Sequence, residues 1–177
     1  VAAVPDGARK AVASVAALAG QGRSAKLLRA IGAKSVGDFW KLVDRLRTER
    51  AALLDALASA GIDVLLAPAY ATPALPHGMS KNFTFASSTA ILWNAFQLPA
   101  GVVPVTKVRR DETQRETSRD LIERHAAKVD AESAGLPVGV QVIGRPWAES
   151  TVLAVMSALE ASVRDDVDFP HTPVDPR

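Results

Sequence analysis

Residues 35–68 constrain the fold more than any other stretch, because a helical pattern there leads directly into a short apolar run. Ser35, with Asp38 three residues later, is a capping-box pattern that predicts the start of a helix. Gly61 predicts where that helix ends. The run that follows is rich in branched residues and closes at Pro68. A helix that feeds such a run indicates a buried strand in an α/β fold.

A stripe of apolar residues at helical spacing supports the helix in this stretch. Its members are Phe39, Leu42, Val43, Leu46, Leu53, Leu54 and Leu57. Arg50 falls within the stripe. We expect its stem to lie along apolar surface while the guanidinium reaches water, rather than being buried and paired.

Two further apolar runs predict strands at residues 102–106 and 138–143. Pro104 removes a hydrogen-bond donor from the first of these, so that strand is expected at an edge of the sheet or irregular there. Other helices are predicted at residues 8–19, 24–31 and 85–97, and in a final segment after Trp147.

Half of the residues from 107 to 134 are charged. This composition predicts a solvent-facing insertion, helical from about Ser118 onward. Leu121 and Ile122 stand out as an adjacent apolar pair within it.

Charge is unevenly distributed along the chain, although its net value is only +2. The first 50 residues hold ten Lys or Arg against four Asp or Glu, which suits either an anionic surface such as a membrane or ordinary solvated helix faces. No apolar run approaches the roughly 20 residues of a membrane span. We expect a cytoplasmic chain that can lie peripherally against a membrane, and no nucleic-acid partner because no recognisable binding motif occurs.

Histidine-based or cysteine-based catalysis is not expected. The chain has no cysteine, and His77, His125 and His171 lack any nucleophile-elbow context. Ser87 and Ser88, with Lys81 nearby, lie inside a predicted helix whose backbone donors are already used, so a catalytic role is not expected for them either.

No metal or cofactor site is predicted. The ligand-like residues near the end, from Asp165 to His171, lie in a polar tail without a scaffold. The glycines at residues 20 and 22 lack both the phosphate-binding pattern and a preceding strand.

Two strings, at residues 98–106 and 135–141, resemble the carboxy-terminal half of amidase-signature enzymes. The first reads Leu-Pro-Ala-Gly-Val-Val-Pro-Val-Thr and the second Gly-Leu-Pro-Val-Gly-Val-Gln. The wording of the first string, the length of the charged insertion and its Asp120-Leu121-Ile122 step are similar to the fatty-acid-amide-hydrolase branch of that family. Residues 34–40 and 63–68 also look like that branch.

The resemblance implies the carboxy-terminal part of an α/β/α fold around a mixed sheet. Residues 1–34 correspond to cap-like helices and residues 35–177 to the amidase core, with the charged insertion at 107–134. Family chemistry uses a Ser-Ser-Lys triad and an acyl-serine intermediate. No Gly-Gly-Ser-Ser-Gly signature occurs in these 177 residues, so none of the catalytic residues is carried over.

What the resemblance does carry over is the wall of a substrate pocket. Thr84, Ser87 and Ile91 match positions that line the acyl channel, and Leu121 and Ile122 match an apolar pair near its mouth. Leu28, with Leu27 and Ile31, falls near the helices that form the membrane cap. Packing under the insertion is the alternative for Leu121 and Ile122.

The resemblance therefore implies an amide hydrolase segment that cleaves carboxylic or fatty acid amides together with an amino-terminal portion. A general amidase or a glutamyl-tRNA amidotransferase A-type subunit, and a non-catalytic or degenerate binding chain, are the alternatives. The expected partners are an amide substrate and the amino-terminal portion, and a homodimer is left open.

Overall fold

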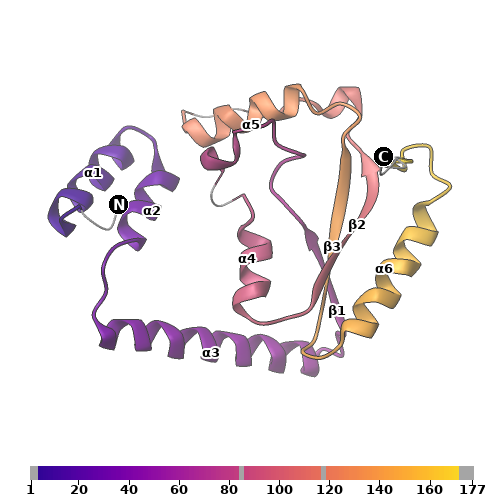
Figure 1. The fold of residues 1–177 in the computed structure, drawn as a ribbon, viewed down its shortest axis with the longest axis horizontal. Coiled ribbons are helices and arrows are strands. Elements are labelled where there is room, and N and C mark those ends of the chain that lie inside the picture. The colour runs from indigo at the N-terminus through magenta and orange to yellow at the C-terminus, as the bar shows by residue number, and fades with distance from the viewer. Residues whose placement is uncertain (1–3, 84–85, 117–118, 172–177) are drawn as a thin grey trace.

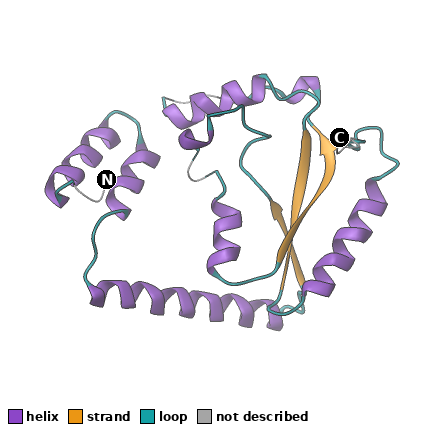
Figure 2. Ribbon diagram, in the orientation of Figure 1, coloured by secondary structure: helices purple, strands orange, loops and turns teal. Residues whose placement is uncertain are grey.

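The computed structural model describes residues 4–83, 86–116 and 119–171. Helices dominate this part of the chain, around a small sheet (Figure 2). The helices are α1 (Asp6–Leu18), α2 (Gly22–Ala30), α3 (Val36–Ser59), α4 (Ser88–Ala95), α5 (Leu121–Ala131) and α6 (Glu149–Val163). Two short 3-10 helices lie at Ser80–Asn82 and Arg110–Glu112.

Three strands form one antiparallel sheet within the described residues, in the order β1 (Val64–Pro68), β3 (Pro137–Gly144), β2 (Ala100–Lys107). The three predicted strands are thus confirmed, but β1 is an edge strand without a buried residue, which corrects the expectation of a buried strand there. The register shifts in β2 between Pro104 and Thr106, as expected for a proline that cannot donate to the ladder.

Helices cover both faces of the sheet, with α4 and α6 on opposite sides (Figure 1). On one face Ile143 of the central strand packs with Phe96 and Leu98, and with Leu53 and Leu54 of α3. On the other face Val142 packs against α6. Alternate residues of a strand point to opposite faces, so adjacent positions of β3 anchor two separate cores.

The helices on each face of the sheet leave part of one edge strand uncovered. The uncovered part is on β1 at one face and on β2 at the other. Leu66 lies opposite Val142 in the register, on the face packed by α6, yet it is 60% exposed. Val102 lies opposite Gln141, whose side chain shares the α3–α4 face, and is 49% exposed. Large apolar side chains at both edges therefore have no covering element among the described residues.

Helix α3 begins and ends where the sequence predicts. The backbone N–H of Asp38 donates to the Ser35 Oγ over 3.1 Å, and the Ser35 hydroxyl donates to the Asp38 carboxylate over 2.8 Å. Gly61, with φ +65°, takes the left-handed conformation that glycine adopts readily at a helix end.

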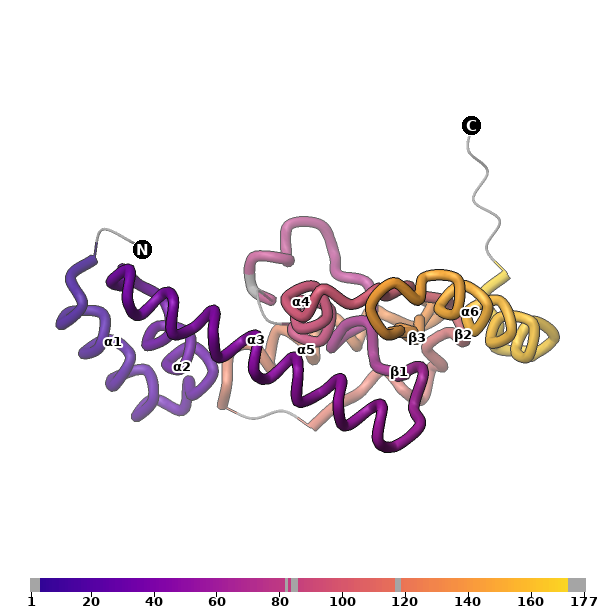
Figure 3. The backbone as a smooth tube through the Cα atoms, turned by 90° about the horizontal axis from the view of Figure 1, so that it is seen from below, coloured from indigo at the N-terminus to yellow at the C-terminus, as the bar shows by residue number. Residues whose placement is uncertain are grey.

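The apolar stripe of α3 packs over only part of its length. Leu57 is buried, and the neighbouring leucines 53 and 54 join the core, whereas Phe39, Trp40 and Leu42 are about half exposed. Figure 3 shows the first turns of α3 extending away from the sheet toward α1 and α2.

The prediction for Arg50 is wrong. Its Nε donates a 2.6 Å hydrogen bond to the carbonyl of Phe96, at the end of α4, and the residue is half-buried. The carbonyls at a helix end have no partner within the helix, so a guanidinium from α3 satisfies one of them.

Helices α1 and α2 pack on each other around a buried arginine. Arg9 is 6% exposed; its Nε donates to the Leu28 carbonyl over 2.9 Å and its guanidinium pairs with Asp6 at 2.9 Å. Gly32 lies against the same guanidinium, where a Cβ would have no room. The chain then reaches α3 through a short connection (Figure 1).

The insertion at 107–134 is not wholly solvent-facing, which corrects the sequence prediction. Helix α5 buries Ala126 and Val129 against Phe83. Asp130 is also buried, and its carboxylate forms a two-pronged ion pair with Arg115. The insertion contributes a third, small core in addition to the two on the faces of the sheet.

Candidate functional site

A hollow of about 840 Å³ lies between α2, α5 and the segment that leads into α4. We call it the α2–α5 hollow. Volumes of this size are typical of small-molecule sites. It is lined by Arg23, Ser24, Lys26, Leu27, Ala30, Ala71, Thr72, Lys81, Phe83, Ala86, Ser88, Arg115, Leu121, Ile122, His125 and Ala126.

Leu121 and Ile122 enter the wall of this hollow at the start of α5. The Asp120 side chain caps the helix by accepting from the Ile122 backbone N–H over 2.8 Å. Ile122 packs against the core around Phe83, while Leu121 is about half exposed. Ile122 therefore both packs in the core and lines the hollow, whereas Leu121 lines the hollow with a largely exposed side chain.

Gln21 holds α2 against the start of α5, a role that the sequence did not indicate. Its amide Nε2 donates to the Arg119 carbonyl over 3.0 Å, and its Oε1 accepts from the Leu121 backbone N–H over 2.9 Å. Arg23 and Glu123 add an ion pair of 2.5 Å. No motif marks such a residue, because its partners lie about 100 positions away in the sequence.

The remaining pocket-wall residues have different positions. Leu28 is half-buried within the α1–α2 pair, and its helix neighbour Leu27 lines the hollow instead. Ile91 is half exposed on α4, outside the lining. Ser87 is the N-cap residue of α4. Thr84 lies outside the described residues.

Ser87 and Ser88 lie at the start of α4 and not in the interior of a longer helix, which corrects the sequence prediction. Helix α4 begins at Ser88, which is exposed and lines the α2–α5 hollow together with Lys81. First-turn backbone N–H groups have no partner within a helix, so the helix does not use the backbone donors around Ser88, contrary to the sequence prediction.

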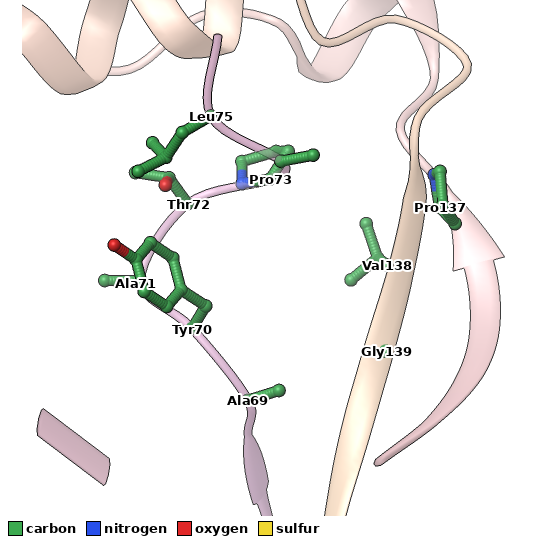
Figure 4. A pocket seen from close by; sticks show the side chains of 10 residues that line it. Ala69, Tyr70, Ala71, Thr72, Pro73, Leu75, Pro137, Val138 and Gly139 are labelled. Carbon is green, nitrogen blue, oxygen red and sulfur yellow. The ribbon is translucent and has the colours of Figure 1, made fainter. Parts of the chain in front are cut away.

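A second hollow of about 580 Å³ lies between residues 69–75 and the start of β3 (Figure 4). Tyr70 lines it, and burial raises the pKa of its phenol above the usual range. The Tyr70 hydroxyl donates to the Phe83 carbonyl over 3.5 Å. Ala71 and Thr72 line both hollows, so the two adjoin across this loop.

Ion pairs of Asp168 fasten the segment after α6 to Lys107 of β2 and to Arg109 just beyond that strand. Asp168 pairs with Arg109 at 3.3 Å and with Lys107 at 4.0 Å. The backbone N–H and then the guanidinium of Arg109 hold the pKa of Glu112 below its usual range.

Within residues 4–83, 86–116 and 119–171, no three His, Asp or Glu side chains gather as a metal site.

No helix in the described part of the chain combines the length and apolar character that crossing a membrane requires.

The structure defines an α/β fold with helices on both faces of a sheet, beside a hollow lined by apolar and polar side chains. A family model described as Amidase matches residues 13–153. The chain belongs to the amidase family.

Two curated relatives and one solved structure illustrate the likeness. The chain is 34% identical over 143 residues to fatty-acid amide hydrolase 1 of Sus scrofa, covering 78% of this chain and 24% of that protein. It is 32% identical over 106 residues to fatty acid amide hydrolase 1 of Caenorhabditis elegans, covering 58% and 18%. A solved fatty acid amide hydrolase superposes with a TM-score of 0.56 at 21% identity, over 77% of this chain and 25% of that one.

These likenesses confirm the predicted family and fold class. The chain spans about a quarter of the length of the pig relative and of the solved structure.

Proposed function

We propose that residues 1–177 form part of an amide hydrolase and supply the wall of its substrate hollow, while the catalytic serines and lysine belong to a further portion of the protein. The α2–α5 hollow carries this proposal, because its lining includes the Leu121–Ile122 pair expected from the family resemblance. The apolar part of this lining, which includes Leu27 and Phe83 beside that pair, suits a fatty acyl chain.

The reaction proposed for the whole protein is hydrolysis of carboxylic or fatty acid amides through an acyl-serine intermediate. A lysine would activate a bridging serine, which activates the nucleophile. Thr84, Ser87 and Ile91 are proposed as channel wall, supported by their neighbours Ala86 and Ser88, which line the hollow. Residues 1–34 would act as a cap, with Leu28 in it, and residues 35–177 as core.

The bare edges of the sheet support a partner portion. Leu66 and Val102 expose apolar surface on opposite faces, and the outer edges of β1 and β2 have no further strand among the described residues. A sheet that continues beyond both edges would cover these side chains and pair the free backbone groups.

Purified residues 1–177 are expected to hydrolyse neither oleamide nor short amides, and to take up no fluorophosphonate probe. A serine is labelled only when a base activates it and donors hold the oxyanion. Gel fluorescence and a turnover assay measure this, with the whole protein as encoded serving as the positive control. Labelling that disappears in Ser88→Ala would contradict the proposal, since it would place the nucleophile within this chain.

Contact of α1 with a membrane surface is proposed from its outward face. Val12, Val15 and Leu18 are all more than half exposed there, and the first 50 residues are strongly basic. Val15→Asp with Leu18→Asp is expected to weaken binding to phosphatidylserine vesicles about tenfold or more in sedimentation, since burial of one such side chain alone is worth about 1.5–3 kcal/mol.

The control for this experiment is Leu153→Asp on α6, compared with Val15→Asp alone, because Leu153 is 64% and Val15 66% exposed. It should bind vesicles as the unchanged protein does, and high salt should weaken both. Equal losses in the control, or binding unaffected by salt and by the α1 changes, would contradict membrane contact through α1.

A further inference from the structure

Basic side chains line the α2–α5 hollow, and no acidic residue is among its lining in the part of the chain that the structure describes. The basic residues are Arg23, Lys26, Lys81 and Arg115. A concave site lined by one sign of charge concentrates ligands of the opposite sign.

Two of these four cations are neutralised from outside the hollow. Arg23 pairs with Glu123 at 2.5 Å, and Arg115 pairs with the buried Asp130. Lys26 on α2 and Lys81 beside the entry to α4 form no ion pair within the described residues. The uncompensated charge of the hollow therefore lies on two lysines that come from different elements.

Apolar side chains, which we call the floor of the hollow, line it together with these lysines. Leu27, Phe83 and Ile122 face the hollow from α2, the segment before α4, and α5. Phe83 and Ile122 also belong to the core that α5 builds, so the floor is firmly packed. A ligand that satisfies both parts of the wall has an alkyl chain and an anionic head.

We propose that the α2–α5 hollow binds a fatty-acid anion in preference to a neutral amide of the same chain length, with Lys26 and Lys81 holding its carboxylate. This inference rests on the proposed function for its setting, because a fatty-acid anion is what hydrolysis of a fatty acid amide releases. The binding itself requires no catalysis. The hollow would therefore retain product more tightly than neutral substrate.

Calorimetric titration of the whole protein as encoded tests this inference, with three ten-carbon ligands below their micelle concentrations and with the catalytic serine first blocked by a small fluorophosphonate so that no amide is hydrolysed during the titration. Decanoate, decanamide and decylammonium share one chain and differ in the charge of the head. We expect decanoate to bind about fivefold more tightly than decanamide, from two partly solvated ion pairs, and decylammonium more weakly than either. The preference should shrink as salt is added.

The double variant Lys26→Met, Lys81→Met should lose the preference for decanoate and keep its affinity for decanamide within about twofold, because the methionines preserve the apolar stems. The matched control is Lys41→Met, Lys128→Met, which removes the same charge from exposed positions outside the hollow. It should retain the preference. Thermal unfolding followed by circular dichroism establishes that both variants are folded.

Equal binding of decanoate and decanamide, no binding of either, or an equal loss of preference in the control pair would overturn the inference. Binding to anionic vesicles without binding of monomeric decanoate would also overturn it, since the lysines would then face a bilayer. If the protein hydrolyses amides but shows no preference for decanoate, the proposed function holds and this inference fails. If it prefers decanoate but hydrolyses no amide, this inference about binding holds and the proposed function fails.

Discussion

Replacing Ile143 with alanine is expected to lower the free energy of unfolding of residues 1–177 by about 2–5 kcal/mol. Ile143 is 1% exposed at the centre of β3, and it joins α3, α4 and β1 in one core. Alanine would forfeit the burial of the removed atoms and leave a cavity that packed neighbours fill only in part. Urea unfolding followed by circular dichroism measures the change, with an unaltered denaturant slope.

Leu66→Ala is the control in the same sheet. Because Leu66 is largely exposed, this change should shift stability by no more than about 0.5 kcal/mol in residues 1–177. In the whole protein it should cost distinctly more if a further portion covers β1. A loss at Leu66 as large as at Ile143 in the chain alone would contradict the structural assignment of which face is covered.

Gly144→Ala is expected to destabilise the chain by about 1–3 kcal/mol through overpacking. A Cβ at this position would lie 2.6 Å from Cγ2 of Val152 and 3.4 Å from the Ala148 carbonyl oxygen. Val152 is buried and branched at Cβ, so its side chain has little freedom to turn aside. The amino-terminal end of α6 must then shift away from β3, and the midpoint of urea unfolding reports the cost.

Two comparisons make this prediction specific. Gly7→Ala, in the first turn of α1 with no atom within 4 Å of the added methyl group, should instead stabilise by up to about 1 kcal/mol. Adding Val152→Ala to Gly144→Ala should cost less than the sum of the two single changes, because the clash disappears. Strict additivity would mean that the glycine is not limiting the approach of α6.

Local chemistry made the strands and the α3 boundaries predictable. The expected strand at residues 102–106 is observed at Ala100–Lys107, and its irregularity falls at Pro104, where the donor is missing. The Ser35 cap is likewise a contact between near neighbours in the sequence. Features of this kind are determined within a few residues, so periodicity and turn chemistry suffice to find them.

Contacts between distant elements were not predictable in the same way. The bond from Arg50 to the end of α4 joins segments 46 positions apart, and nothing in the local pattern distinguishes it from a solvated arginine. For α5 a signal was present, since Ile122, Ala126 and Val129 follow helical spacing, but the surrounding charges concealed it.

The candidate site was predictable only where the family resemblance reached it. Leu121 and Ile122 were singled out in advance, and both line the α2–α5 hollow. The lysines of that hollow come from two separate segments, and Gln21 acts through main-chain groups of a distant loop. Such groups are brought together by tertiary packing alone, which no single stretch of sequence records.

The two edge strands of the antiparallel sheet, β1 and β2, differ in how readily another copy of the chain could pair with them. Along β2, Pro104 and the register shift interrupt the row of backbone groups that another copy would need, so stacking there is discouraged. Along β1 only the terminal Pro68 limits pairing, and Leu66 offers an apolar anchor. Residues 1–177 kept at high concentration should therefore aggregate through β1, and a charged residue at Leu66 should delay the onset of turbidity.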